Sequence, residues 1–265
     1  MRDILNDLEK GEALSDPDPV RRAQKQMKTQ LPKKFYQTVT VAGNEGGGYG
    51  IHLDGKPVRT PGRRNLTLPT AAAAQIIADE FASQEEVIDP ARMPATRLAN
   101  TAIDGVADDP QAVVEDLLRF AASDMLFYRA EGPETLVKRQ AERWDPLIDW
   151  ASSALSARFI LAEGVMHVAQ PREALAAFGV HLNAISNPVA LAALHTMTTL
   201  TGSAILALAI AKGEIGVKEG WELAHLDEDW TIEHWGEDAE AKARRLSREE
   251  EMMAAAAMFA ATSSF

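Results

Sequence analysis

Cysteine is absent from this chain of 265 residues. Its absence excludes disulfide bonds, catalysis by a thiolate and zinc sites with cysteine ligands. Nothing in the sequence therefore requires an oxidising compartment, and a reducing cytoplasm is compatible with it.

Basic residues are few compared with acidic ones. The chain has 27 Lys and Arg against 39 Asp and Glu, a formal charge of −12. This balance disfavours binding to a phosphate backbone, so we expect no nucleic-acid partner. It also lacks the basic amphipathic helix that would bind a membrane surface.

Motifs of common catalytic sites are missing as well. There is no Gly-x-Ser-x-Gly nucleophile elbow. The glycine-rich run from Gly43 to Gly50 lacks the Lys-Ser/Thr of a phosphate-binding loop, so it predicts a hairpin turn. His52 is expected to be a lone histidine on the exposed strand face, and His167, His181 and His195 lack sequence-close carboxylates at the spacing of metal ligands. The sequence predicts no catalytic, cofactor-binding or metal site.

Charged residues are absent from the run between Val189 and Ala211, which is long enough to span a bilayer. However, polar residues occupy its middle, where a lipid-spanning helix is most apolar. We predict two buried helices instead, with a break near Thr201-Gly202. Asn187 would cap the first, followed by Pro188, and Thr201 or Ser203 would cap the second.

The remaining patterns predict an α+β fold, with a small β-rich N-terminal domain followed by a mainly α-helical C-terminal domain. Residues 1–30 contain an interrupting Asp-Pro-Asp-Pro sequence and are expected to form a flexible N-terminal arm. Short strands and one helix are predicted between residues 31 and 92, and helices between 93 and 265. Among these helices, one face of Val137, Ala141, Trp144 and Ile148 is expected to be buried.

The stretch from Phe81 to Asp104 contains two prolines within five residues, Pro90 and Pro94, and a new helical element can begin at each. We call this feature a double restart. An alanine-rich helix through Phe81 must end before Asp89-Pro90, and Pro94 fits only the first turn of a new helix. An elbow between domains is the simplest interpretation of this segment.

Three of the five tryptophans lie among acidic residues between Trp221 and Glu240. On one continuous helix, Trp221 and Trp235 would share an apolar stripe that Glu228 interrupts. Glu228 is expected to cap a helix or to pair with a buried arginine such as Arg129 or Arg97. Alternatively, this acidic and aromatic surface binds a protein partner.

Several segments, in this order, resemble the family of assembly chaperones that bind the alpha subunit of the ATP synthase F1 sector, the ATP12 chaperone family. The similarity extends from about residue 34 to residue 238. The segments are Tyr49–Pro61, Gln84–Leu98, Asp124–Arg129, Gln140–Pro146 and Ile232–Glu237.

This resemblance implies a chaperone without catalytic activity or cofactor. The protein would bind the free alpha subunit and shield its beta-facing surface until the alpha/beta ring forms. It would be a monomer when free, without membrane insertion, in a bacterial cytoplasm or, less expectedly, a mitochondrial matrix. The partner-binding candidates are Glu228, Glu233, Trp235, Glu237 and Asp238.

One alternative function stays open at this stage. A small-molecule hydrolase or transferase would need a site in the crease between the domains, built from His52, Asp54, Arg97 and Asp104. Convergence of these four side chains on one pocket would favour it.

The methionine-rich C-terminal segment is expected to form a helix docked on the body, although an adaptable surface for a client is the other interpretation.

Overall fold

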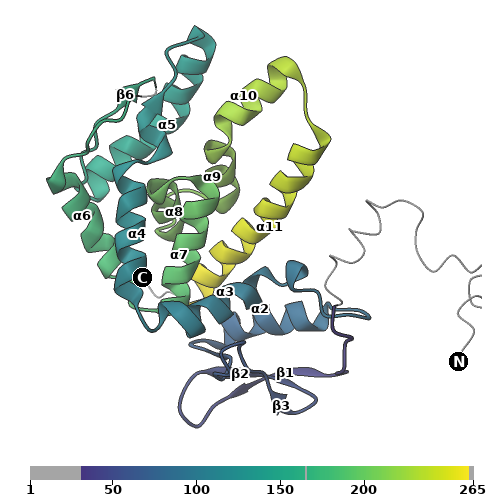
Figure 1. Cartoon of the computed structure of the whole chain (residues 1–265). Coiled ribbons are helices and arrows are strands. Elements are labelled where there is room, and N and C mark those ends of the chain that lie inside the picture. The colour runs from purple at the N-terminus through teal and green to yellow at the C-terminus, as the bar shows by residue number, and fades with distance from the viewer. Residues whose placement is uncertain (1–30, 165, 263–265) are drawn as a thin grey trace, which may run out of the picture.

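A computed structural model describes residues 31–164 and 166–262. The predicted N-terminal arm, residues 1–30, lies outside the described residues. The described chain is an α+β fold in which a small antiparallel sheet is followed by helices. Figure 1 shows the sheet at one end of the molecule, with the helices stacked beyond it.

The sheet forms from short strands of the predicted β-like segment. β1 (Val39–Gly43) pairs with β2 (Tyr49–Leu53), and β2 also pairs with β3 (Lys56–Pro57) and β4 (Thr67–Leu68). The glycine-rich run is the turn between β1 and β2, as predicted. Ile51 and Leu53 point to the core, while His52 between them is half-buried.

Helix α2 (Ala71–Ala82) covers the sheet and leads into the predicted double restart. A 3₁₀ turn, η1 (Pro90–Arg92), precedes α3 (Pro94–Thr101), so both restarts are confirmed. Glu80 on α2 accepts hydrogen bonds from Ala95 N, Thr96 N and Thr96 Oγ1 at 2.6 to 2.7 Å. This carboxylate therefore caps the N-terminus of α3 from a neighbouring helix.

A π-helical turn, η2 (Ala102–Val106), continues α3 and connects the helices to the sheet. Asp104 accepts hydrogen bonds from Thr60 Oγ1 at 2.6 Å and Gly62 N at 2.7 Å. Buried residues form one core cluster that runs from the sheet into the helices. The domain boundary between residues 92 and 93 stays a prediction.

Helix α7 lies at the centre of the helical part. α7 (Pro188–Thr201) is buried on nearly all sides and contacts α3, α4 (Pro110–Ala122), α8 (Ala204–Ala211) and α11 (Ala239–Thr262). The predicted break is confirmed, because Gly202 adopts φ 70° and Ser203 caps α8. Asn187 caps α7 as predicted. Among the described helices, none has both the length and the apolar character needed to cross a membrane.

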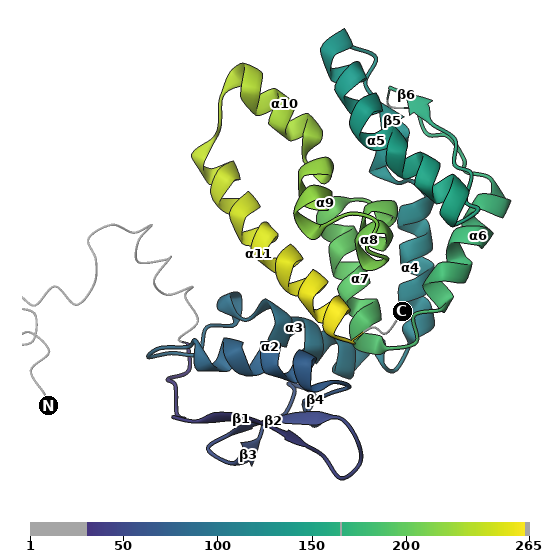
Figure 2. The same cartoon turned by 180° about the vertical axis from the view of Figure 1, so that it is seen from behind.

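The outer helices flank this centre. α5 (Glu134–Ala154) and α6 (Arg172–Asn183) lie on one flank. β5 (Tyr128–Arg129), just before α5, pairs in parallel with β6 (Ala162–Glu163) in the connection between the two helices. α9 (Val217–Ala224) and α10 (Leu226–Trp235) lead to α11 on the other flank, as Figure 2 shows from behind.

The predicted buried face of α5 is partly wrong. Trp144 is fully buried, but Val137 is 36% exposed. Leu136, Gln140 and Leu147 face the core instead. Gln140 is buried because its carbonyl oxygen accepts from Ala130 N at 2.8 Å and its amide donates to Asp227 at 2.8 Å, contacts that an apolar pattern cannot reveal.

The C-terminal helix is docked on the body, as predicted. Met252, Met258 and Phe259 on α11 are buried, and α11 packs along α7. Thr70 at the start of α2 donates a hydrogen bond to Ala261 O at 2.6 Å. The end of α11 therefore also contacts the helix that covers the sheet.

Candidate partner-binding site

The acidic and aromatic segment lies on two helices rather than on one. The prediction of one continuous stripe from Trp221 to Trp235 is wrong, because the chain bends at His225 between α9 and α10. The His225 ring packs on Trp221 at 4.0 Å, and its Nδ1 lies 2.8 Å from Trp221 O. Trp221 is 3% exposed, whereas Trp235 is 73% exposed.

The C-terminal end of α10 carries an exposed aromatic cluster. Trp230 is buried and anchors it, with His234 stacked at 4.0 Å and Trp235 packed edge-on at 5.5 Å. Gly236, with φ 89°, ends the helix directly after Trp235. The indole of Trp235 is therefore held by its neighbours but open to a partner. Figures 1 and 2 place this end of α10 far from the sheet.

Glu233 is paired within the chain. Arg139 on α5 donates to its two carboxylate oxygens at 2.9 and 2.8 Å. These hydrogen bonds hold the pKa of Glu233 below its usual value and raise the pKa of Arg139. Glu233 remains half-exposed, so it can contact a partner while it positions α10 against α5.

Glu228 does not have the predicted partner. It lies on the surface, 3.9 Å from Arg245 on α11 and 4.0 Å from His225. Of the two arginines proposed for it, Arg129 pairs with Asp145 at 2.8 Å and Arg97 pairs with Glu251 at 2.7 Å.

Asp229, the neighbour of Glu228, has the stronger contact with α11. Arg245 donates to both of its carboxylate oxygens. Hydrogen bonding to Asp229 raises the pKa of the Arg245 guanidinium. Glu228 is therefore a secondary member of a network that fixes α10 to α11.

Glu237 and Asp238 lie in the connection between α10 and α11. Lys242 donates to Glu237 at 2.8 Å, and Asp238 accepts from Ala241 N at 2.8 Å. Asp238 therefore stabilises the first turn of α11. Both residues are exposed next to Trp235, so the structure brings together three of the five predicted contact residues at one tip.

A groove between α5 and the α9–α10 pair adjoins this tip. Its volume is about 320 Å³. Arginines from α5 and carboxylates from all three helices line it, and the acidic groups outnumber the basic ones. The lining residues are Arg139, Glu142, Arg143, Glu222, Leu226, Asp229 and Glu233.

Sequence reasoning missed the arginines of α5 and Asp227. Their role depends on pairs 87 and 94 residues apart, Gln140 with Asp227 and Arg139 with Glu233. The only available signal was that Gln140 and Glu233 both lie in segments that carry the family resemblance.

The residues of the alternative hydrolase or transferase site have separate partners. Asp54 accepts from Thr38 N and Oγ1 at 2.8 Å, and Asp104 binds the loop at Gly62. His52 is half-buried in the sheet, with no hydrogen-bond partner for Nδ1 among the described residues. Arg97 pairs with Glu251 on α11. These contacts hold separate parts of the fold together and give no support to a common site.

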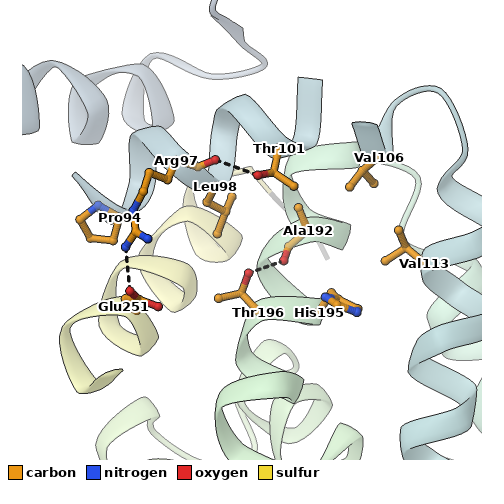
Figure 3. Close-up of a pocket in the computed structure, with 10 residues that line it drawn as sticks. All are labelled: Pro94, Arg97, Leu98, Thr101, Val106, Val113, Ala192, His195, Thr196 and Glu251. Carbon is orange, nitrogen blue, oxygen red and sulfur yellow. Dashed lines mark hydrogen bonds and ion pairs between the residues drawn. The ribbon is translucent and has the colours of Figure 1, made fainter. Parts of the chain in front are cut away.

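Figure 3 shows Arg97 and Glu251 at the edge of a separate pocket of about 330 Å³ between α3, α4, α7 and α11. Its hydroxyl groups are bonded to the backbone, Thr101 to Arg97 O at 3.1 Å and Thr196 to Ala192 O at 2.9 Å. His195 binds Asp116 at 2.8 Å, a pairing that the sequence did not reveal. Among the described residues, both hydroxyls and His195 therefore have partners other than one another.

Comparisons with known proteins agree on one family. The family model described as ATP12 chaperone protein matches residues 33–152. The Atu1473 protein of Agrobacterium tumefaciens is 58% identical, with a TM-score of 0.86 over 99% of this chain and 97% of that protein. Atp12 from Paracoccus denitrificans is 41% identical, with a TM-score of 0.81 over 88% of this chain and 99% of its own. A point mutant of the same Paracoccus protein gives 40% identity and the same TM-score. The chain therefore belongs to the ATP12 chaperone family.

Proposed function

We propose that this chaperone binds the free alpha subunit of the ATP synthase F1 sector and shields its beta-facing surface until the alpha/beta ring forms. An unpaired subunit of an obligate ring exposes a large apolar surface that favours aggregation. A chaperone that covers this surface would keep the subunit competent for assembly. We place this activity in the bacterial cytoplasm, with a free monomer that forms a one-to-one complex.

The proposal rests on the exposed Trp235 at the end of α10, together with the membership of this chain in the ATP12 chaperone family. A large aromatic side chain that is 73% exposed and bordered by carboxylates is typical of an interface anchor. Glu237 and Asp238 lie beside it and are the acidic residues best placed for direct contact. Glu233 and Glu228 contribute by holding α10 in position as well as by their charge.

The test is co-expression with the alpha subunit alone, followed by size-exclusion chromatography. We expect the wild type to keep the alpha subunit in solution and to co-elute with it. Trp235→Ala and Glu237→Lys/Asp238→Lys should reduce the co-eluting fraction. Aggregation of the alpha subunit with the wild type would contradict the proposed client.

Matched controls separate the site from general effects. Met166→Ala removes another apolar side chain, 74% exposed, and should not change co-elution. Glu163→Lys/Glu173→Lys makes the same change in net charge on the flank of β6 and α6, where both residues are exposed. Equal losses in these controls and in the α10 variants would argue against an interface at α10.

A further inference from the structure

Strand β1 is an edge of the sheet. It pairs with β2 on one side, and no strand of the described chain pairs with its other side. Asp54 N donates to Thr38 O at 3.0 Å, which sets the hydrogen-bonding pattern of this ladder. Because bonded and non-bonded pairs alternate in antiparallel strands, the N–H and C=O groups of Val39, Val41 and Gly43 point to the outer edge.

Three of the features that usually prevent strand addition are absent from the sequence and register of this edge. Natural proteins protect edge strands with lysine, proline or a bulge. The sequence of β1, Val-Thr-Val-Ala-Gly, has no charge and no proline, and its register with β2 is continuous. Val39 and Val41 are half-buried toward the core, whereas Thr40 and Ala42 are exposed. The outer edge of β1 is therefore regular, and no strand of the described residues pairs with it.

The sheet is also the basic end of an acidic protein. Residues 31–68 contain six Lys and Arg and two Asp and Glu, a formal charge of +4. Residues 69–265 contain 15 basic and 31 acidic residues, a formal charge of −16. Lys33, Lys56, Arg59 and Arg63 are exposed around the strands. Charge complementarity at this end favours an acidic partner segment.

We propose that β1 binds an extended segment of the client by strand addition, and that acidic residues flank the uncharged centre of this segment. The main-chain hydrogen bonds of Val39, Val41 and Gly43 would supply affinity, and the basic surroundings would select the acidic flanks. Naming the client rests on the proposed function, whereas the site itself rests on the strand edge and its charge. Figures 1 and 2 place the sheet and α10 at opposite ends, so the client would be held at two separate points.

Two synthetic peptides test the site without the client. Both have the centre Thr-Val-Thr-Val-Thr, flanked in one by pairs of glutamate and in the other by pairs of lysine. We expect the acidic peptide to bind the full-length protein at least about tenfold more tightly, and added salt to weaken its binding. Absence of binding by both peptides would overturn strand addition. Equal affinities would overturn the acidic selectivity.

Substitutions at Val41 test the role of the backbone. Val41→Pro removes one outward N–H and leaves the hydrogen bonds to β2 in place, because proline is tolerated at a strand edge. Val41→Thr has a similar shape and keeps the N–H. We expect the proline variant to lose binding of the acidic peptide and the threonine variant to retain it. Circular dichroism confirms that both variants are folded. Retained binding by a folded proline variant would overturn the proposal.

Amide hydrogen exchange of the wild type gives a second readout that needs no variant. The amides of Val39, Val41 and Gly43 should exchange quickly in the free protein and slow down when the acidic peptide is added. Unchanged exchange with bound peptide would place the peptide elsewhere and overturn the proposal. Slow exchange already in the free protein would mean that its own chain or a second copy covers the edge, which also overturns it.

The same measurement with the alpha subunit separates the two proposals. If the alpha subunit co-elutes but amide exchange at β1 is unchanged, the proposed client stands, and the proposal that a segment of this client pairs with β1 is overturned. If the acidic peptide protects β1 and the alpha subunit does not bind, the edge site stands and the proposed client fails.

Discussion

Arg139 on α5 donates two hydrogen bonds to the carboxylate of Glu233 on α10, at 2.9 and 2.8 Å. A bidentate pair of this kind fixes the relative orientation of two helices as well as matching their charge. Arg245 on α11 binds Asp229, one turn before Glu233 on α10, so α10 is bonded to both of its neighbours. The exposed Trp235 is thereby held at the end of a well-supported helix.

A charge swap distinguishes positioning by Glu233 from direct contact. We expect Glu233→Arg alone to weaken binding of the alpha subunit, because two guanidinium groups would then face each other and displace α10. The double variant Arg139→Glu/Glu233→Arg restores the pair with reversed polarity and should recover most of the binding. Affinity is measured by titration with the purified alpha subunit.

The matched control for this swap is Arg139→Glu alone, which should bind the alpha subunit as weakly as Glu233→Arg does. A double variant that stays as weak as the single variants would contradict a positioning role. Glu233 would then contact the client directly through its negative charge.

Local rules were sufficient for much of the fold. Asn187-Pro188 and Thr201-Gly202-Ser203 contain their own start and stop signals, so α7 begins and ends and α8 begins as predicted. The double restart around Pro90 and Pro94 follows from the steric limits of proline. The break at His225 had no such signal, because ring packing on Trp221 and the pairing of α10 with α11 determine it.

The candidate site was predictable as a segment but not as a geometry. Composition identified the acidic and aromatic stretch that contains Trp235. It could not pair Glu228 with Arg245 or Glu233 with Arg139, because these contacts join different helices. The face of α5 was misplaced for the same reason, since Gln140 is buried by its hydrogen bond to Asp227 rather than by apolar character.

Glu80 should be important for stability, because its two oxygens accept from Ala95 N, Thr96 N and Thr96 Oγ1. Burial raises the pKa of this carboxyl above its usual value, although those hydrogen bonds oppose the shift. Glu80→Gln replaces one acceptor oxygen with an amide that cannot accept. We expect a loss of about 1 to 3 kcal/mol in the free energy of unfolding, measured by urea titration.

Asp79→Asn is the control for Glu80→Gln. Asp79 is the preceding residue on α2, and its exposed side chain accepts from Gln75 Nε2 at 2.8 Å on the helix surface. This variant should be close to the wild type in stability. Equal effects of the two substitutions would show that the capping of α3 by Glu80 contributes little.

Met258 tests the docking of α11. It is fully buried where the last turns of this helix pack along α7. Met258→Ala should reduce the free energy of unfolding by about 2 to 5 kcal/mol, because it removes buried apolar contacts and leaves a cavity. Met253→Ala, at a half-buried position on the same helix, should have a smaller effect in the same urea titration. The reverse order would contradict the observed face of α11.

Asp124 should make stability depend on pH. It is fully buried and accepts hydrogen bonds from Leu126 N at 3.1 Å and Ile205 N at 3.0 Å. Burial raises its pKa from 3.8 to about 6, although these hydrogen bonds and one from Ser203 oppose the shift. The folded state therefore holds this proton more tightly than the unfolded state does.

The contribution of Asp124 to stability should consequently be highest below pH 4 and should decrease as the pH rises through about 6, where the buried carboxyl ionises. Asp124→Asn cannot titrate, so the wild type minus the variant isolates this group from the exposed carboxylates. We expect that difference in the free energy of unfolding to fall by up to about 3 kcal/mol between pH 4 and pH 7. Urea titrations at several pH values measure it. A difference that is constant, or that rises with pH, would show that the Asp124 carboxylate is stabilised in its charged form by the N-terminus of α8.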